Sequence, residues 1–294
     1  MFESEVSRLQ INQMTALPVV KMIHGGINLE TEANFIREAE ILVELQHRNI
    51  IQLLGVCIPL EPLSLIIEYM PFGDFHSFLR NYANRSSSCK SVVGTANGEV
   101  VNAHSLPQTI SFYKTDFSEQ HPSKLNVKMP TEMAIDACEA MIYLSEAYYV
   151  HRDVATRNFL VGRELIVKLS DLSMCRPIKP DVDFISAYDE CLPMKWLPLE
   201  SILEGRFLTD TDVWSFDILL WEVFSYAVEP YTDQNYTEII DALKRGDRLI
   251  RPFNCPESIY QLMLKCWSAD RTERPKFNYI GSCLKEICTD LKVV

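Results

Sequence analysis

The hydrophobic pattern of this 294-residue chain changes near Pro71, and this change limits the folds open to it. Before Pro71, apolar residues alternate or run in short blocks, which indicates strands. Beyond Pro71 the helical period dominates. We therefore predict an α+β fold with a small strand-rich part and a large, mainly helical part. The expected elements are strands at 17–23, 53–57, 63–69, 159–161 and 166–169, and helices at 30–45 and 131–150.

Residues 81–127 interrupt this order. They are rich in Ser, Asn, Gly and Thr and show no sustained period. A compact domain seldom contains so long a loop without secondary structure. We expect an exposed, disordered insert here.

Composition excludes several classes of protein. A formal net charge of -12 argues against nucleic acid or an anionic membrane surface as the main partner. The nine cysteines are scattered singly, which is typical of buried free thiols in a reducing compartment. The most hydrophobic helical segment, 213–224, contains Asp217 and Glu222, so we expect a buried core helix there and no membrane span. The polar first residues predict no signal peptide.

Lys21 lies inside the apolar strand segment 17–23. A lysine in a strand normally marks an exposed edge, and this remains one interpretation. Glu38 falls on the apolar face of the following helix and offers the second interpretation, a buried Lys21–Glu38 ion pair, because a charge is buried at high cost unless it has a partner.

The segment 151–158 places an acid, two arginines and an amide between a helix and a strand. Loops in such positions carry catalytic groups. Asp171 follows thirteen residues after Asn158, at the end of the next strand. Amide and carboxylate oxygens at neighbouring strand ends suit Mg²⁺. The whole spacing is far more specific than the His-Arg-Asp triplet alone.

These motifs together resemble the protein kinases, over nearly the whole chain. The resemblance implies that Lys21 holds the α- and β-phosphates of ATP and that Glu38 is its partner. It also implies that Asp153 is the catalytic base, that Arg157 helps to hold Asp153 and the substrate, and that Asn158 and Asp171 bind Mg²⁺.

The resemblance divides the chain into a bilobal fold. Residues 1–66 form a partial N-lobe without a Gly-rich loop, 67–70 the hinge, and 71–294 the C-lobe with 81–127 as the insert. The further ATP contacts it implies are Val19, Ile67, Glu68, Met70 and Leu160. The structural and activation residues it implies are His151, Arg152, Leu172, Glu200, Arg274 and Tyr188, and it implies that Arg274 pairs with Glu200.

The subclass resembles tyrosine kinases. The runs 155–158 and 193–196 are similar to the tyrosine-kinase catalytic loop and to the segment that seats a substrate tyrosine. The runs 214–216 and 220–225 are similar to the muscle-specific, Trk and Ror receptor kinases. This implies a cytoplasmic domain of a plasma-membrane receptor, attached to a span that the chain lacks. Tyrosine-containing protein substrates and a receptor dimer are the implied partners, with adaptor proteins unknown.

The sequence departs from the kinase pattern at four places. No Gly-x-Gly-x-x-Gly precedes Lys21, so we expect the phosphate-covering loop to be missing, through an incomplete gene model rather than a natural loss, which is the alternative. Leu172 and Ser173 replace Phe and Gly after Asp171. Leu172 still fills an apolar slot, whereas Ser173 lacks glycine's conformational freedom. Asp217 replaces a small residue and needs either a partner or an exposed position.

The fourth departure is in the activation segment, which has Lys179, Asp183 and Phe184 where relatives carry paired tyrosines, leaving Tyr188 alone. Asp183 either reflects drift or mimics a phosphate that pairs with Arg152. The chain is therefore predicted to be a tyrosine kinase, and the alternative is a pseudokinase scaffold that binds partners without phosphoryl transfer.

Overall fold

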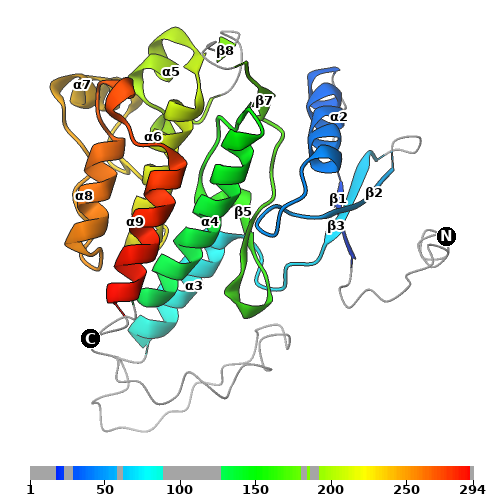
Figure 1. The fold of residues 1–294 in the computed structure, drawn as a ribbon, viewed down its shortest axis with the longest axis horizontal. Helices are drawn as coiled ribbons and strands as arrows, with labels where there is room; N and C mark the ends of the chain where they lie inside the picture. The colour runs from blue at the N-terminus through cyan, green and yellow to red at the C-terminus, as the bar shows by residue number, and fades with distance from the viewer. Residues whose placement is uncertain are drawn as a thin grey trace, which may run out of the picture.

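The computed structural model describes residues 18–22, 29–57, 62–88, 127–179, 184–185 and 192–291. Its smaller part is an antiparallel sheet with one helix (Figure 1). The described sheet has the order β1-β3-β2, from β1 (Pro18–Met22), β2 (Leu53–Cys57) and β3 (Ser64–Glu68). Helix α2 (Leu29–Glu44) lies against it and buries Phe35, Ala39 and Leu42. The strands and the helix agree with the pattern of alternating and helix-period residues before Pro71.

The larger part is mainly helical and is built around α6 (Thr209–Ser225) (Figure 1). Every residue of α6 from Thr211 to Phe224 is buried, as the prediction of a core helix required. Helices α4 (Lys128–Glu146) and α9 (Phe277–Asp290) lie side by side. The other described helices of this part are α3 (Phe75–Ser88), α5 (Leu199–Glu204), α7 (Tyr236–Arg245) and α8 (Glu257–Cys266). The predicted α+β architecture is confirmed.

Three short antiparallel pairs position the loops between the two parts. They are β4 (Tyr149–Val150) with β7 (Arg176–Pro177), β5 (Phe159–Val161) with β6 (Val167–Leu169), and β8 (Phe184–Ile185) with β9 (Arg206–Phe207). The segment 151–158 joins β4 to β5, and Asp171 follows β6. Both predicted chemical segments therefore emerge from neighbouring strands.

Backbone hydrogen bonds tie the smaller part to β6. The Ile51 amide donates to the Leu169 carbonyl at 2.8 Å, and the Leu169 amide donates to the Asn49 carbonyl at 2.8 Å. The Asn49 side chain adds a bond to the Val167 carbonyl at 2.9 Å. A Lys168–Glu68 ion pair at 2.6 Å joins β6 to the end of β3. These contacts fix the strand that leads into Asp171.

Two predicted segments differ from the structure by more than one residue, and the helix expected from 131 already begins at Lys128. The helix expected over 131–150 ends at Glu146, because Tyr148 adopts a left-handed conformation (φ 60°) that stops the helix, and the next two residues form β4. The predicted insert begins at residue 81, yet α3 continues to Ser88. Residues 89–126 of the insert lie outside the described residues. Among the described helices, none has the length and apolar character to span a bilayer.

Candidate active site

Lys21, Glu38 and Asp171 converge at one end of the site. Lys21 Nζ lies 2.7 Å from a Glu38 carboxylate oxygen and 3.7 Å from Asp171 Oδ2. The Glu38 side chain is buried, whereas those of Lys21 and Asp171 are each 38% exposed. Strand β1 is at the edge of the described sheet. The two interpretations of Lys21 are thus both met, since an edge-strand lysine also forms the ion pair.

The charges of this triad stabilise one another against burial. Burial opposes the Lys21 ammonium, but Asp171 and Glu38 outweigh it, so the pKa of Lys21 is raised. Burial raises the pKa of Glu38, and Lys21 offsets only part of this. Burial also opposes ionisation of Asp171, but Lys21 and two hydrogen bonds from Ser173 lower its pKa overall. The ammonium and the Asp171 carboxylate are therefore charged at neutral pH.

The triplet Asp171-Leu172-Ser173 is compact. Leu172 is fully buried, which fits its predicted role in an apolar slot. The Ser173 amide donates to Asp171 Oδ1 at 3.1 Å, and Ser173 is not among the described residues with positive φ. In this conformation the backbone needs no glycine.

Asp153 is held by two side chains of its own loop. Arg157 contacts one carboxylate oxygen of Asp153, and Asn158 Nδ2 donates to the other at 2.7 Å. Asn158 Nδ2 also donates to the Asp153 carbonyl at 2.6 Å. The Asp153 side chain remains 19% exposed, so its carboxylate is accessible to a substrate. The proximity of Arg157 to Asp153 agrees with the resemblance.

The loop is joined to the metal-ligand candidate Asp171 through Ser170. The Ser170 amide and its hydroxyl both donate to the Asn158 carbonyl, each at 2.9 Å. Asn158 uses its amide nitrogen on Asp153, which leaves its Oδ1 as an acceptor. The available donors are then an amide oxygen and a carboxylate, the oxygen ligands that Mg²⁺ shares with substrate phosphates. The residues present fit a divalent cation.

Asp212 of α6 fixes the start of the catalytic loop and was not predicted. Its carboxylate accepts the His151 amide at 2.6 Å and the Arg152 amide at 2.9 Å. Arg152 has φ 70°, an unusual conformation for a non-glycine residue that persists only where its surroundings hold it. Burial raises the pKa of Asp212 to about 7, against the opposing effect of these two amides. His151 is buried as well, and burial lowers the pKa of its imidazole.

Other predicted residues lie in two groups. Among the predicted ATP contacts, Ile67 and Met70 are buried, Glu68 and Leu160 are half-buried, and Val19 is 38% exposed. In the larger, helical part, Arg274 Nη1 lies 2.6 Å from Glu200, and the Arg274 side chain is only 1% exposed. The predicted Glu200–Arg274 contact is present.

The Arg152 side chain contacts residues on both sides of the predicted activation segment. Its guanidinium lies 5.2 Å from the centre of the Phe207 ring, and its Nε donates to the Met174 carbonyl at 2.9 Å. Asp183, which was predicted as one possibility to pair with Arg152, lies outside the described ranges, so this hypothesis stays a prediction. The predicted activation residue Tyr188 also lies outside them.

Asp217 contradicts the expectation that it has a partner or an exposed position. It is fully buried, and neither carboxylate oxygen has a hydrogen-bond partner within the described parts of the chain. Burial raises its pKa well above the usual value, and the neighbouring Cys266 thiol offsets this only weakly. Burial therefore favours the protonated form of this carboxyl group.

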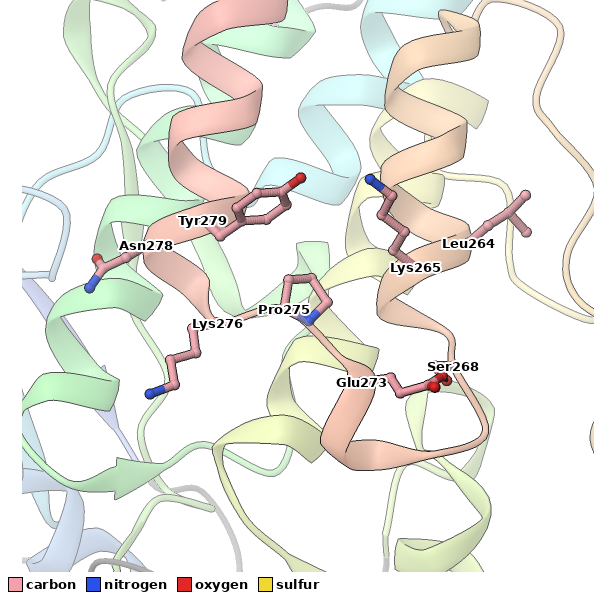
Figure 2. Close-up of a pocket in the computed structure, with 8 residues that line it drawn as sticks. All are labelled: Leu264, Lys265, Ser268, Glu273, Pro275, Lys276, Asn278 and Tyr279. Carbon is pink, nitrogen blue, oxygen red and sulfur yellow. The ribbon is translucent and has the colours of Figure 1, made fainter.

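A separate open pocket of about 750 Å³ lies between α8 and the start of α9 (Figure 2). Lys265 and Tyr279 face each other across it, with the ammonium 5.9 Å from the ring centre. None of its lining residues belongs to the predicted site.

Comparisons with known proteins agree with this geometry. Residues 3–284 match the family model "Protein tyrosine and serine/threonine kinase", and the chain belongs to this family. The chain is 35% identical over 277 residues to the tyrosine-protein kinase transmembrane receptor Ror of Drosophila melanogaster, covering 94% of this chain and 35% of the relative. It is 33% identical over 273 residues to the high affinity nerve growth factor receptor of Gallus gallus, covering 93% of this chain and 32% of that receptor. The chain spans about a third of the length of these relatives.

Proposed function

We propose that this chain is the kinase domain of a transmembrane receptor and transfers the γ-phosphoryl group of ATP to tyrosine hydroxyls of proteins. The observation that carries the proposal is the arrangement of Asp153, held by Arg157 and Asn158, with the Lys21–Glu38–Asp171 triad joined to the same loop. The receptor context follows from the similarity to the Ror protein, which is a transmembrane tyrosine kinase.

Each group of the site has a task in such a transfer. Bound ATP supplies the phosphoryl group; Asn158 and Asp171 would hold Mg²⁺, which would supply positive charge to the phosphates. Lys21 adds a fixed positive charge on the same side, because Glu38 prevents it from moving away. Asp153 orients the tyrosine hydroxyl and accepts its proton. Arg157 keeps the Asp153 carboxylate in place for this step.

The tyrosine preference rests on the segments 155–158 and 193–196, which resemble those of tyrosine kinases. Trp196 of the second segment lies under the Arg157 guanidinium, 4.2 Å from the ring centre. The surface that receives the substrate is therefore continuous with the group that holds Asp153. Protein substrates, a receptor dimer and a membrane attachment beyond this chain belong to the same proposal.

The test is a phosphorylation assay with the purified chain, ATP and MgCl₂. Two peptides that differ only in carrying tyrosine or serine are offered together, and the products are weighed by mass spectrometry. We expect phosphate on the tyrosine peptide, and loss of the reaction in Lys21→Met. The matched control Lys265→Met alters an exposed lysine outside the site and keeps the rate.

Phosphate on the serine peptide alone would overturn the tyrosine assignment. If the chain binds ATP but transfers phosphate to neither peptide, the enzyme assignment fails, and the chain is instead a scaffold that binds nucleotide.

A further inference from the structure

Glu222 is a buried carboxylate at the centre of contacts that reach the catalytic loop. Its residue is 1% exposed, and it lies near the end of α6. Oε2 accepts the Thr156 amide at 3.0 Å and the Trp196 indole Nε1–H at 3.1 Å. Oε1 accepts the Thr156 hydroxyl at 3.0 Å. One side chain thus binds two segments that are forty residues apart in sequence.

A fourth donor approaches from α3. His76 Nδ1 lies 3.4 Å from the Thr156 hydroxyl oxygen and 3.7 Å from Glu222 Oε1. The single hydroxyl hydrogen of Thr156 is used on Glu222, so a hydrogen bond between His76 and Thr156 requires a proton on Nδ1. His76 then donates to the Thr156 hydroxyl oxygen, whereas its 3.7 Å separation from Glu222 Oε1 is too long for a hydrogen bond. The three hydrogen bonds that Glu222 accepts therefore come from the Thr156 amide, the Thr156 hydroxyl and the Trp196 indole N–H.

The first route from Glu222 to the reacting groups runs through the loop itself. Thr156 is adjacent to Arg157, and the Arg157 guanidinium contacts the Asp153 carboxylate. Fixing both the amide and the hydroxyl of Thr156 sets the position from which the Arg157 side chain starts.

The second route runs through Trp196. Its indole N–H is held by Glu222, and its carbonyl accepts the Ser215 hydroxyl at 2.8 Å. The ring so held lies under the Arg157 guanidinium, with 4.2 Å between the guanidinium carbon and the ring centre. Two contacts therefore restrict the position of Arg157: Thr156 holds its backbone, and the Trp196 ring lies against its guanidinium. Glu222 accepts hydrogen bonds from both Thr156 and Trp196.

We propose that Glu222 is a positioning residue for phosphoryl transfer, which sets the catalytic loop in register with the segment 193–196 that receives the substrate. This rests on the proposed function. As a positioning residue, Glu222 is expected to act through Thr156 and Trp196 and not by touching substrate or nucleotide. Its effect is expected on the substrate side, because within the described residues the hydrogen bonds of Glu222 go to Thr156 and Trp196, and the Lys21–Glu38–Asp171 triad is held by other contacts. Small displacements of catalytic groups are costly to the rate of an enzyme, on the order of a hundredfold per ångström.

Glu222→Gln is the decisive variant, because it keeps the shape and replaces one acceptor oxygen with a donor amide. Asp217→Asn is the matched control, since it makes the same change to a fully buried acid of the same helix that contacts neither segment. Trp196→Phe is a milder variant that removes only the indole donor of one route.

Steady-state kinetics provide the first readout. In Glu222→Gln we expect the kcat/KM for a tyrosine peptide to fall roughly ten- to hundredfold, with a raised peptide KM and an ATP KM within about twofold of the wild-type value. Trp196→Phe changes the same parameters by a smaller factor, and the double variant is less than additive with Glu222→Gln. A purely structural role would lower kcat through the active fraction and leave both KM values unchanged, which would overturn the proposal.

Hydrogen exchange provides a second readout that does not depend on activity. In Glu222→Gln, amides in 154–158 and the segment 193–197 exchange at least about tenfold faster, while Asp217→Asn leaves both segments protected. Unchanged exchange in both segments would overturn the proposal. If the wild-type chain transfers no phosphate, the proposed function fails, whereas the exchange experiment still decides whether Glu222 holds the two segments together.

Discussion

Helix α6 buries acidic side chains on two sides, and these sides differ in what the carboxylates meet. At 3.6 residues per turn, Asp212, Ser215 and Glu222 fall within an arc of about 80°. Each of them bonds to the catalytic loop or to Trp196. Asp217 lies roughly 140° away from either acid, and no hydrogen-bond partner meets its oxygens in the described ranges.

The comparison shows that burial alone does not determine what a carboxyl group does. Asp212 receives two backbone amides, and Glu222 receives a backbone amide and side-chain donors, so hydrogen bonds oppose the cost of burying these carboxylates. For Asp212 burial still outweighs them and raises the pKa to about 7. Asp217 receives no backbone amide from the described residues and has only the weak Cys266 thiol beside it, so burial raises its pKa well above the usual value. One side of α6 organises a functional site, and the other carries a polar group at a cost to stability.

The largest effect is expected for Asp212→Ala. This change leaves the His151 and Arg152 amides buried without their acceptor and releases the left-handed conformation of Arg152. We expect a loss of about 3 kcal/mol or more in the free energy of unfolding, measured with urea. A loss below about 1 kcal/mol would show that the organising side of α6 is not essential to the fold.

Asp217→Asn is expected to act in the opposite direction. In the unfolded chain Asp217 is ionised near neutral pH, whereas in the folded chain its raised pKa keeps it protonated. Folding therefore takes up a proton, and the wild-type free energy of unfolding falls as pH rises above the usual aspartate value toward the raised one. Asn removes this dependence, so we expect the variant to be more stable at pH 7.

The measurement is urea unfolding of both proteins from pH 5 to pH 8. The wild-type stability should fall relative to that of Asp217→Asn with a slope of up to about 1.4 kcal/mol per pH unit. Parallel curves for the two proteins would mean that Asp217 is ionised in the folded state and has a partner, which would remove the contrast with Glu222.

Ser215→Ala is expected to have the smallest effect. It removes a hydroxyl that donates to the Trp196 carbonyl at 2.8 Å and approaches the Thr211 carbonyl at 3.2 Å. We expect a loss of about 1 kcal/mol in unfolding free energy. Ser282→Ala is the control, because its hydroxyl also bonds to a helix carbonyl but is exposed, and it should change stability by less than about 0.5 kcal/mol. Equal effects of the two variants would argue against a specific role for Ser215.

The sequence predicted most of the fold because its periodicities are local. The segments 53–57 and 159–161 match their strands, and helix 30–45 matches α2 to within one residue at each end. The predicted helix 131–150 was too long, since apolar Tyr149 and Val150 continue the hydrophobic pattern while Tyr148 has already left the helical conformation. Periodicity does not register such a backbone change.

The site was predicted where a motif names its residues, and missed where support comes from a distant helix. The contact of Lys21 with Glu38 and that of Glu200 with Arg274 follow the expected pattern. Asp212, Ser215 and Glu222 were not assigned, although their shared face in an otherwise apolar helix is visible in the sequence. For Asp217 the dichotomy of partner or exposure was wrong, because protonation offers a third outcome that only the surroundings of the side chain reveal.

Asp153→Asn tests the central claim most directly, namely that the loop supported by α6 performs phosphoryl transfer. The variant keeps the shape of the side chain and its contact with Asn158 but cannot accept a proton as the carboxylate does. With saturating ATP, Mg²⁺ and a tyrosine peptide, we predict that kcat falls by at least about a hundredfold while the free energy of unfolding stays within about 1 kcal/mol of the wild-type value. A variant that transfers phosphate at nearly the wild-type rate would contradict the account.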